Sequence, residues 1–241
     1  MCLGCLENSL VSMNVATRKG KGSKEAYNLF IKYINKLMYK SKEIYVLKID
    51  ISKYFYNINH EMLLDMVKEK IKDKEVISFL SYILDSTNLE YINTKINYFN
   101  NKYNLDLPTY YFNKGLSIGS VCSQMLAVFN LNEFDHFIKE KLNCKYYIRY
   151  MDDGIIIDND KERLKKVFNV LKKLIKKYKL EFNNKTRIYN STSGFNFLGI
   201  NYYVINKRII KRISKRNKKK IIKKINYNNY KFYKNYLKYI K

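Results

Sequence analysis

The segments that most constrain the fold are two apolar, β-branched runs with acidic residues at their ends. YIRYMDDGIIID, at 147–158, sets Asp152 and Asp153 between two such runs, the pattern of a strand, a tight turn and a second strand. EIYVLKID, at 43–50, predicts another short strand that ends on Asp50. If these strands are neighbours in one sheet, we expect the three carboxylates to meet at one edge of it.

Two interpretations of the acidic hairpin compete. Asp-Asp-Gly is a good hairpin turn in itself, and on this hairpin alone the plain turn is favoured. Three clustered carboxylates, however, repel one another and raise at least one pKa unless cations neutralise them. Mg²⁺ binds one or two carboxylates together with substrate phosphates, and two such ions about 3.5–4 Å apart clamp the attacking and leaving oxygens of a phosphoryl transfer.

The rest of the chain predicts an α+β fold, with helices packed on an antiparallel sheet. Apolar periodicity and turn signals predict, in order, a helix at 24–40, a strand at 43–50, a helix at 60–84, a polar, irregular stretch with a possible hairpin at 88–114, a long helix at 119–142 opened by Gly and Ser, the hairpin at 145–158, a helix at 160–179, and strands at 185–190 and 195–204. The last residues, 207–241, form a basic tail studded with tyrosine.

The charge balance favours a polyanionic partner. The chain has 47 Lys and Arg against 21 Asp and Glu, a formal net charge of +26, which points to nucleic acid above all. Codon bias is the plainer explanation for part of this charge, because Lys, Asn, Ile and Tyr are abundant while there is one Pro and no Trp.

Other classes of protein fit less well. With 46% hydrophobic residues, most of the chain is expected to be ordered. No apolar run reaches the roughly 18 residues of a membrane span, and no leader opens the chain, so no membrane partner and a cytoplasmic location are expected. Cys2 and Cys5 are spaced C-x-x-C, but no second pair follows at zinc spacing, so we expect no structural metal there.

Several segments together resemble reverse transcriptases of the bacterial retroelement kind. The matching segments are RKGKGSKEA (18–26), KIDISKYF (48–55), GLSIGSVCSQ (115–124), YMDD (150–153), LEFNNKTRIYN (180–190) and GFNFLGI (194–200), in family order across about residues 14–204. The form I-G-x-x-x-S-Q resembles diversity-generating retroelement enzymes and related unassigned bacterial groups. Ser117 stands where Pro is more usual in the family.

The resemblance implies roles for individual residues. Asp50, Asp152 and Asp153 would be the catalytic, metal-binding carboxylates, with two Mg²⁺ ions (or Mn²⁺) held mainly by the first two. The residues implied to contact substrate are Ile51 through its carbonyl, Phe55 as a steric gate under the sugar, Gly119 close to the incoming base pair, Ser123, Gln124, and Lys185 near the leaving pyrophosphate. The implied partners are an RNA template, a DNA or RNA primer, and dNTPs.

The resemblance also implies a right-hand polymerase architecture. A reverse transcriptase domain would cover 1–203, with partial fingers at 1–45 and a palm with a fingers insertion at 46–203, and residues 204–241 would begin an α-helical thumb. Only 17 residues precede Arg18, where the resembled enzymes carry a further fingers segment. We therefore expect a fragment, a truncated start, or an accessory protein that supplies this part.

Two alternative functions stay open on the sequence. One is an RNA-templated RNA polymerase with the same palm, which Phe55 argues against because that chemistry must accept the 2′-hydroxyl. The other is an inactive remnant that binds structured RNA, against which the intact set of three aspartates weighs. His60 and His136 have plain interpretations, as a cap after the first strand and as a residue on the polar face of a helix.

Overall fold

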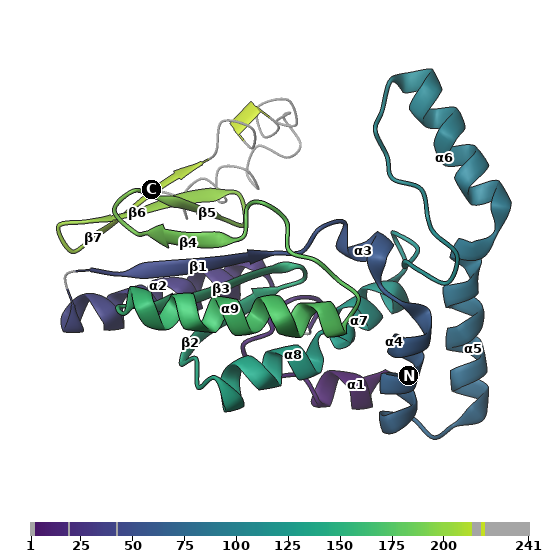
Figure 1. Cartoon of the computed structure of the whole chain (residues 1–241), viewed down its shortest axis with the longest axis horizontal. Coiled ribbons are helices and arrows are strands. Elements are labelled where there is room, and N and C mark those ends of the chain that lie inside the picture. Colours follow the sequence, from purple (N-terminus) through teal and green to yellow (C-terminus); the bar gives the residue numbers. More distant parts are fainter. Residues whose placement is uncertain (1–2, 19, 42, 214–217, 220–241) are drawn as a thin grey trace.

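The computed structural model describes residues 3–18, 20–41, 43–213 and 218–219 (Figure 1). The elements are α1 (Gly4–Asn8), α2 (Ser23–Lys40), β1 (Tyr45–Asp50), α3 (Tyr54–Asn57), α4 (His60–Lys70), α5 (Lys74–Asp85), the 3₁₀ turn η1 (Ser86–Asn88), α6 (Glu90–Tyr103), α7 (Val121–Asn130), α8 (Asn132–His136), the π-helical η2 (Phe137–Lys141), β2 (Tyr146–Tyr150), β3 (Asp153–Asp158), α9 (Lys161–Lys177), β4 (Arg187–Asn190), β5 (Phe195–Phe197), β6 (Ile200–Ile205) and β7 (Arg208–Ile213).

Within the described residues the strands form two antiparallel sheets, which confirms the expected α+β fold. The larger sheet has the order β2-β3-β1-β4, and the smaller one has the order β5-β6-β7. The central strands β1 and β3 pair along their whole length, from Tyr45 opposite Asp158 to Asp50 opposite Asp153. The two acidic strand ends predicted from the sequence therefore lie side by side.

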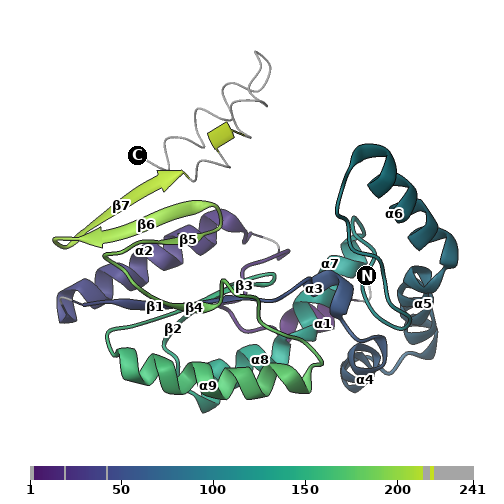
Figure 2. The same ribbon diagram turned by 45° about the horizontal axis from the view of Figure 1, so that its top comes forward.

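The larger sheet is buried on both faces, because apolar side chains occupy both faces of its central strands. In β1, Leu47 and Ile49 belong to one core cluster, to which α4, α7 and α9 contribute. Val46 belongs to a second cluster, to which α2 and the smaller sheet contribute. Figures 1 and 2 show α9 and α2 on opposite sides of this sheet. Burial on both faces fixes the register that brings the acidic ends together.

Two of the predicted helices are interrupted. The helix expected at 60–84 is α4 followed by α5, because the side chain of Asp73 accepts hydrogen bonds from the backbone of Glu75 and Val76 and starts a new helix. The helix expected at 119–142 is α7, α8 and a π-helical turn, with Leu131 leaving helical geometry between the first two. Two short helices, α1 and α3, were not predicted from the sequence at all.

The stretch at 88–114, expected to be irregular with a possible hairpin, contains the helix α6, which projects from the end of α5 (Figures 1 and 2). Hydrogen bonds to the chain that follows the helix explain why this stretch is ordered as a helix. Asn100 forms two hydrogen bonds with the backbone of Leu107, both 2.9 Å long, and Asn93 forms two with the backbone of Tyr110, of 2.9 and 2.8 Å. The helix buries none of its residues, so the sequence has no clear apolar face that would have predicted a helix here.

The C-terminal strands also differ from expectation. The strand predicted at 195–204 is the hairpin of β5 and β6, turned at Leu198 and Gly199, whose φ angles of 48° and 82° are left-handed. The predicted tail starts with β7, which pairs with β6. The expected α-helical thumb start at 204–241 therefore begins with the end of β6 and with β7, and most of the rest of this segment lies outside the residues that the structure describes.

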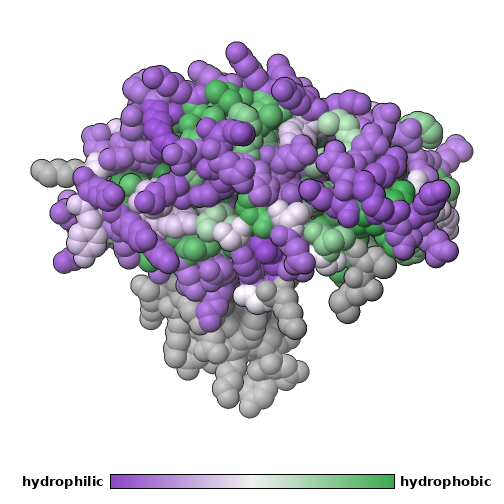
Figure 3. Space-filling view, turned by 90° about the horizontal axis from the view of Figure 1, so that it is seen from below, coloured by the Kyte–Doolittle hydropathy of each residue, from purple (hydrophilic) through white to green (hydrophobic). Residues whose placement is uncertain are grey.

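The surface is mostly hydrophilic on the face that Figure 3 shows. Hydrophobic side chains form separate patches there. Within the described part of the chain, none of the helices has the length and the apolar character needed to cross a membrane.

Candidate active site

The three predicted carboxylates come from two adjacent strands and the turn beside them. Asp50 ends β1 and lies opposite Asp153, the first residue of β3. Asp152 immediately precedes β3, in the turn after β2. All three side chains are half-buried. The structure thus brings together the acids of two segments that are about 100 residues apart in the sequence.

The hairpin turn is made by Met151 and Asp152, not by Asp-Asp-Gly. Tyr150 pairs with Asp153 and closes a two-residue turn, in which Met151 has a φ of +56°. Such a φ is strained for a residue with a side chain, and it persists only where the surroundings hold it. The turn therefore lies earlier than Asp-Asp-Gly suggests, because Asp153 and Gly154 already belong to β3.

A buried ion pair that the sequence analysis did not single out holds this turn. The guanidinium of Arg149 lies 2.8 Å from the carboxylate of Asp135, and the Tyr147 hydroxyl donates a 2.6 Å hydrogen bond to the same carboxylate. Arg149 also donates to the carbonyl of Met151 at 2.8 Å and to that of Val128 at 2.7 Å. One buried guanidinium thus joins the turn, the sheet and α7.

The loop after α9 holds the backbone and side chain of Asp50. The backbone N–H of Asp50 donates to the hydroxyl of Thr186, and that hydroxyl donates to the Asp50 carbonyl, both at 2.9 Å. The side-chain amide of Asn183 donates to the Asp50 carboxylate. Lys185, in the same loop, has its ammonium 4.0 Å from that carboxylate and is 68% exposed. The structure therefore places Lys185 at the predicted site, at its solvent side.

The acidic cluster is crowded and only partly neutralised. Burial, together with repulsion from Asp153 and Asp50, raises the pKa of Asp152 above its usual range. Burial and repulsion from Asp50 also raise the pKa of Asp153, against the attraction of Lys48. The Lys48 ammonium lies 3.3 Å from the Asp153 carboxylate and 4.0 Å from that of Asp50. The alternation of side chains along β1 could have indicated that Lys48 and Asp50 share a face, two residues apart.

The donor set fits a divalent cation. It consists of carboxylate oxygens, the ligands that Mg²⁺ and Mn²⁺ prefer, and Oδ1 of Asp153 is buried without a hydrogen-bond donor among the described residues. Within that same part of the chain, however, no three acidic, His or Cys side chains are arranged to share one ion. An ion bound here would require the carboxylates to turn toward it.

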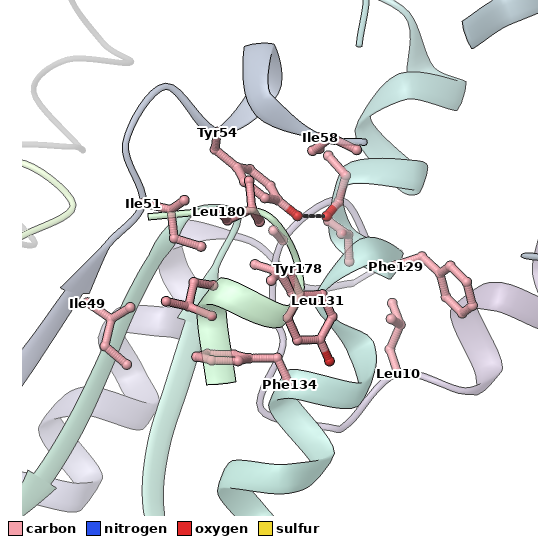
Figure 4. Packing of buried hydrophobic residues seen from close by; sticks show 14 of the residues in the cluster. Leu10, Ile49, Ile51, Tyr54, Ile58, Phe129, Leu131, Phe134, Tyr178 and Leu180 are labelled. Carbon is pink, nitrogen blue, oxygen red and sulfur yellow. Dashed lines mark hydrogen bonds between the residues drawn. The ribbon is translucent and has the colours of Figure 1, made fainter. Parts of the chain in front are cut away.

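Phe55 lies on α3, four residues after Ile51, which forms an isolated bridge with Phe182. The ring of Phe55 is half-buried against the first core cluster. Its carbonyl accepts a 2.7 Å hydrogen bond from the backbone of Leu116. Ile51 itself is buried. The neighbouring Tyr54 is buried too, and its hydroxyl donates to the carbonyl of Ala127 in α7 (Figure 4). These contacts fix Phe55 beside the loop that leads into α7.

The loop before α7 carries the remaining predicted residues. Gly119 is exposed and has a φ of +106°, which favours glycine. The N-cap of α7 is Ser120, and the buried Ser123 hydroxyl hydrogen-bonds that of Ser117 at 3.1 Å. Among the residues described, neither Gly119 nor Gln124 forms a hydrogen bond with the three aspartates.

His60 supports the start of this loop. It is the first residue of α4, and its Nε2 lies 2.6 Å from the carbonyl of Gly115, so Nε2 must be the donor. Nδ1 is buried and has no hydrogen-bond partner within the described residues. Burial lowers the pKa of His60 despite the hydrogen bond to Gly115.

The pH dependence of unfolding should report this environment. The pKa of His60 is lower in the folded than in the unfolded chain, so its stabilising contribution is complete above about pH 6.5 and is lost as the pH falls below that value. We expect the difference between unfolding temperatures at pH 7.5 and pH 5 to shrink in the variant His60→Gln.

His136 provides the opposite control. Its Nε2 bonds the carbonyl of Ser9 and its Nδ1 contacts Glu140, and these contacts raise its pKa. Its contribution is therefore present below about pH 6.5 and is lost as the pH rises. His136→Gln should enlarge the loss of stability on acidification. Equal pH dependence in wild type and His60→Gln would contradict the assignment of His60.

Comparisons with known proteins come from sequence and from structure. A family model described as reverse transcriptase (RNA-dependent DNA polymerase) matches residues 7–202. A search of curated proteins finds no match. Apo telomerase from Candida tropicalis, truncated from its C-terminal domain, superposes with a TM-score of 0.61 at 17% identity, over 87% of this chain and 43% of that one.

A second similar structure is telomerase from Candida albicans in complex with a TWJ fragment of telomeric RNA. It superposes with a TM-score of 0.55 at 14% identity, over 88% of this chain and 35% of that one. At these identities the likeness shows a shared fold. The chain spans less than half the length of either telomerase chain.

Proposed function

Because the family model covers residues 7–202, the chain belongs to the reverse transcriptase family, and from that premise we propose that it is an RNA-directed DNA polymerase. It adds deoxynucleotides to a primer 3′-hydroxyl on an RNA template. The observation that carries the proposal is the register of β1 and β3, which sets Asp50 opposite Asp153 with Asp152 in the adjoining turn. In this proposal, residues 46–203 form the palm, residues 1–45 form partial fingers, and 204–241 begin a thumb.

The proposed chemistry uses the carboxylates as ligands. Asp50 and Asp152 hold divalent cations, and Asp153 completes the acidic site. Two bound Mg²⁺ or Mn²⁺ ions would supply the positive charge that stabilises the in-line transfer of the nucleotide. Asn183 and Thr186 orient Asp50, and Lys185 is near enough to Asp50 for its exposed ammonium to contact the leaving pyrophosphate.

The remaining site residues act on the nucleotide and the template in this proposal. Ile51 offers its backbone carbonyl, and Gly119, Ser123 and Gln124 line the path of the incoming base pair. The net charge of +26 supports the binding of template and primer phosphates. The bacterial retroelement origin, the diversity-generating subtype, an accessory protein and a cytoplasmic location stay predictions from the sequence.

The test is primer extension by the full chain on an RNA template, with dNTPs or rNTPs and with Mg²⁺ or EDTA. We expect the primer to be extended only when dNTPs and Mg²⁺ are both present. An RNA-templated RNA polymerase would extend the primer with rNTPs. An inactive RNA-binding remnant would retain the primer–template in a filter-binding assay without extending it.

Sugar selection tests the role of Phe55. Its half-buried ring can serve either as a gate under the sugar or as ordinary core. If it is the gate, Phe55→Val opens space beneath C2′, and the ratio of rNTP to dNTP incorporation should rise by about tenfold or more. Competition assays with the two nucleotide types measure this ratio.

A control variant tests whether losing an aromatic ring elsewhere in the chain changes the ratio. Phe99→Val changes an aromatic residue on α6 that is 43% exposed, and it should leave the ratio unchanged. If Phe55→Val lowers both incorporation rates equally, Phe55 is a core residue and not a gate.

A further inference from the structure

Lys48 is a buried charge in the middle of the sheet. Its exposed fraction is 7%, which is rare for lysine unless a partner compensates the charge. Its backbone pairs with Ile155 of β3 on one side and with Arg187 of β4 on the other. The position of its Cα is therefore fixed from both sides, and only the side chain can move.

The compensating charges are two of the candidate catalytic carboxylates. The Lys48 ammonium lies 3.3 Å from Oδ1 of Asp153 and 4.0 Å from Oδ2 of Asp50. Oδ1 of Asp153 is buried, and the attraction of the nearby Lys48 ammonium is the largest influence that offsets its charge. Each partner thus makes the burial of the other tolerable.

Lys185 differs from Lys48 in its exposure to solvent. Its ammonium also lies 4.0 Å from Oδ2 of Asp50, but its side chain is 68% exposed, against 9% for that of Lys48. Water and salt screen an exposed charge far more than a buried one. Of these two lysines, Lys48 is the one whose charge acts on the acidic cluster with little screening.

We propose that Lys48 is a positioning residue of the acidic site, which fixes the Asp153 carboxylate and competes with divalent cations for the Asp50–Asp153 pair. Its role toward metal rests on the proposed function, whereas its pairing with Asp153 does not. A fixed positive charge beside the ligands weakens the binding of a further cation. Metal binding then depends on the phosphates that the nucleotide brings, since Mg²⁺ takes one or two carboxylates together with substrate phosphates.

The first experiment measures Mn²⁺ affinity of the full chain without nucleotide, by the electron paramagnetic resonance signal of free Mn²⁺. Lys48→Met removes the buried charge and should tighten binding by about tenfold or more. Lys48→Arg keeps the charge and should restore affinity to within about threefold of wild type. Lys185→Met removes an exposed charge at the same distance from Asp50 and should change affinity by less than about twofold.

A merely structural role would not produce this pattern, because it predicts that Lys48→Met binds Mn²⁺ equally or more weakly. Either of those results would overturn the competition. If Lys48→Met does not fold, Lys48→Gln replaces it in the same Mn²⁺ measurement. This variant also removes the charge but keeps a hydrogen-bond donor beside Asp153, and the same tighter binding is expected.

The second experiment tests the pairing in EDTA, by the unfolding temperatures of Lys48→Met, Asp153→Asn and the double variant. The double variant should lose less than the sum of the two single losses, because each single change already removes the Lys48–Asp153 interaction and the second change has none left to remove. Additive losses would overturn the pairing. If wild type binds no Mn²⁺, the proposed metal-dependent function fails, while this cycle still decides whether Lys48 positions Asp153.

Discussion

Asp152→Asn is expected to reduce primer extension by at least about 10²–10³-fold, because it removes the charge of a metal ligand while keeping its size. The backbone of the turn should be unaffected, since Arg149 holds it through the carbonyl of Met151. RNA binding should persist, because phosphate contacts come from Lys and Arg side chains. Extension rates and salt-dependent RNA affinity, measured on the same preparation, separate the two effects.

The matched control is Asp106→Asn. It also replaces an aspartate by asparagine, but in the exposed segment after α6, which is distant in sequence from the acidic strands. It should extend primers as wild type does. Substantial extension by Asp152→Asn would remove Asp152 from the metal site and leave the two-metal proposal without its second ligand.

Arg149→Met is expected to lower the free energy of unfolding by about 3–5 kcal/mol, because it strands the fully buried carboxylate of Asp135 without its partner. The same change frees the carbonyl of Met151, so the acidic turn loses its support. Urea denaturation at pH 7 measures the loss. Replacing both partners, as Asp135→Leu with Arg149→Met, should recover part of it, because no unpaired charge then stays buried.

Lys68→Met is the control for a surface pair. Lys68 and Asp65 are 3.1 Å apart on α4 with both side chains more than half exposed, and losing this pair should cost less than about 1 kcal/mol. If Arg149→Met costs no more than Lys68→Met, the buried pair does not hold the turn, and the strained φ of Met151 needs another explanation.

The acidic strands could be predicted from sequence because their β-branched residues and acidic ends are local signals. The segments at 43–50 and 145–158 became β1 and the β2–β3 hairpin. The position of the turn could not be predicted, because Asp-Asp-Gly is a turn sequence and only the pairing of Tyr150 with Asp153 moves the turn to Met151. Tertiary register decided between two locally acceptable turns.

The supporting charges were invisible for a different reason. Lys48 is one of many lysines in this chain, and only its burial distinguishes it from a solvated one. Asp135 on α8 and Arg149 on β2 are 14 residues apart, and only the fold brings the carboxylate and the guanidinium together. The helix α6 was missed likewise, since the returning chain stabilises it through the amides of Asn93 and Asn100. Partners distant in sequence leave no periodic signal.

We propose that this chain copies RNA into DNA at the site that holds Asp50. The most direct measurement is single-nucleotide addition by the full chain to a labelled primer on four RNA templates that differ only in the templating base, with wild type and Asp50→Asn. We expect each template to direct the addition of its complementary deoxynucleotide, in Mg²⁺ and not in EDTA, and the reaction to be lost in Asp50→Asn. Addition that ignores the template base, or that survives in Asp50→Asn, would contradict template-directed DNA synthesis at this site.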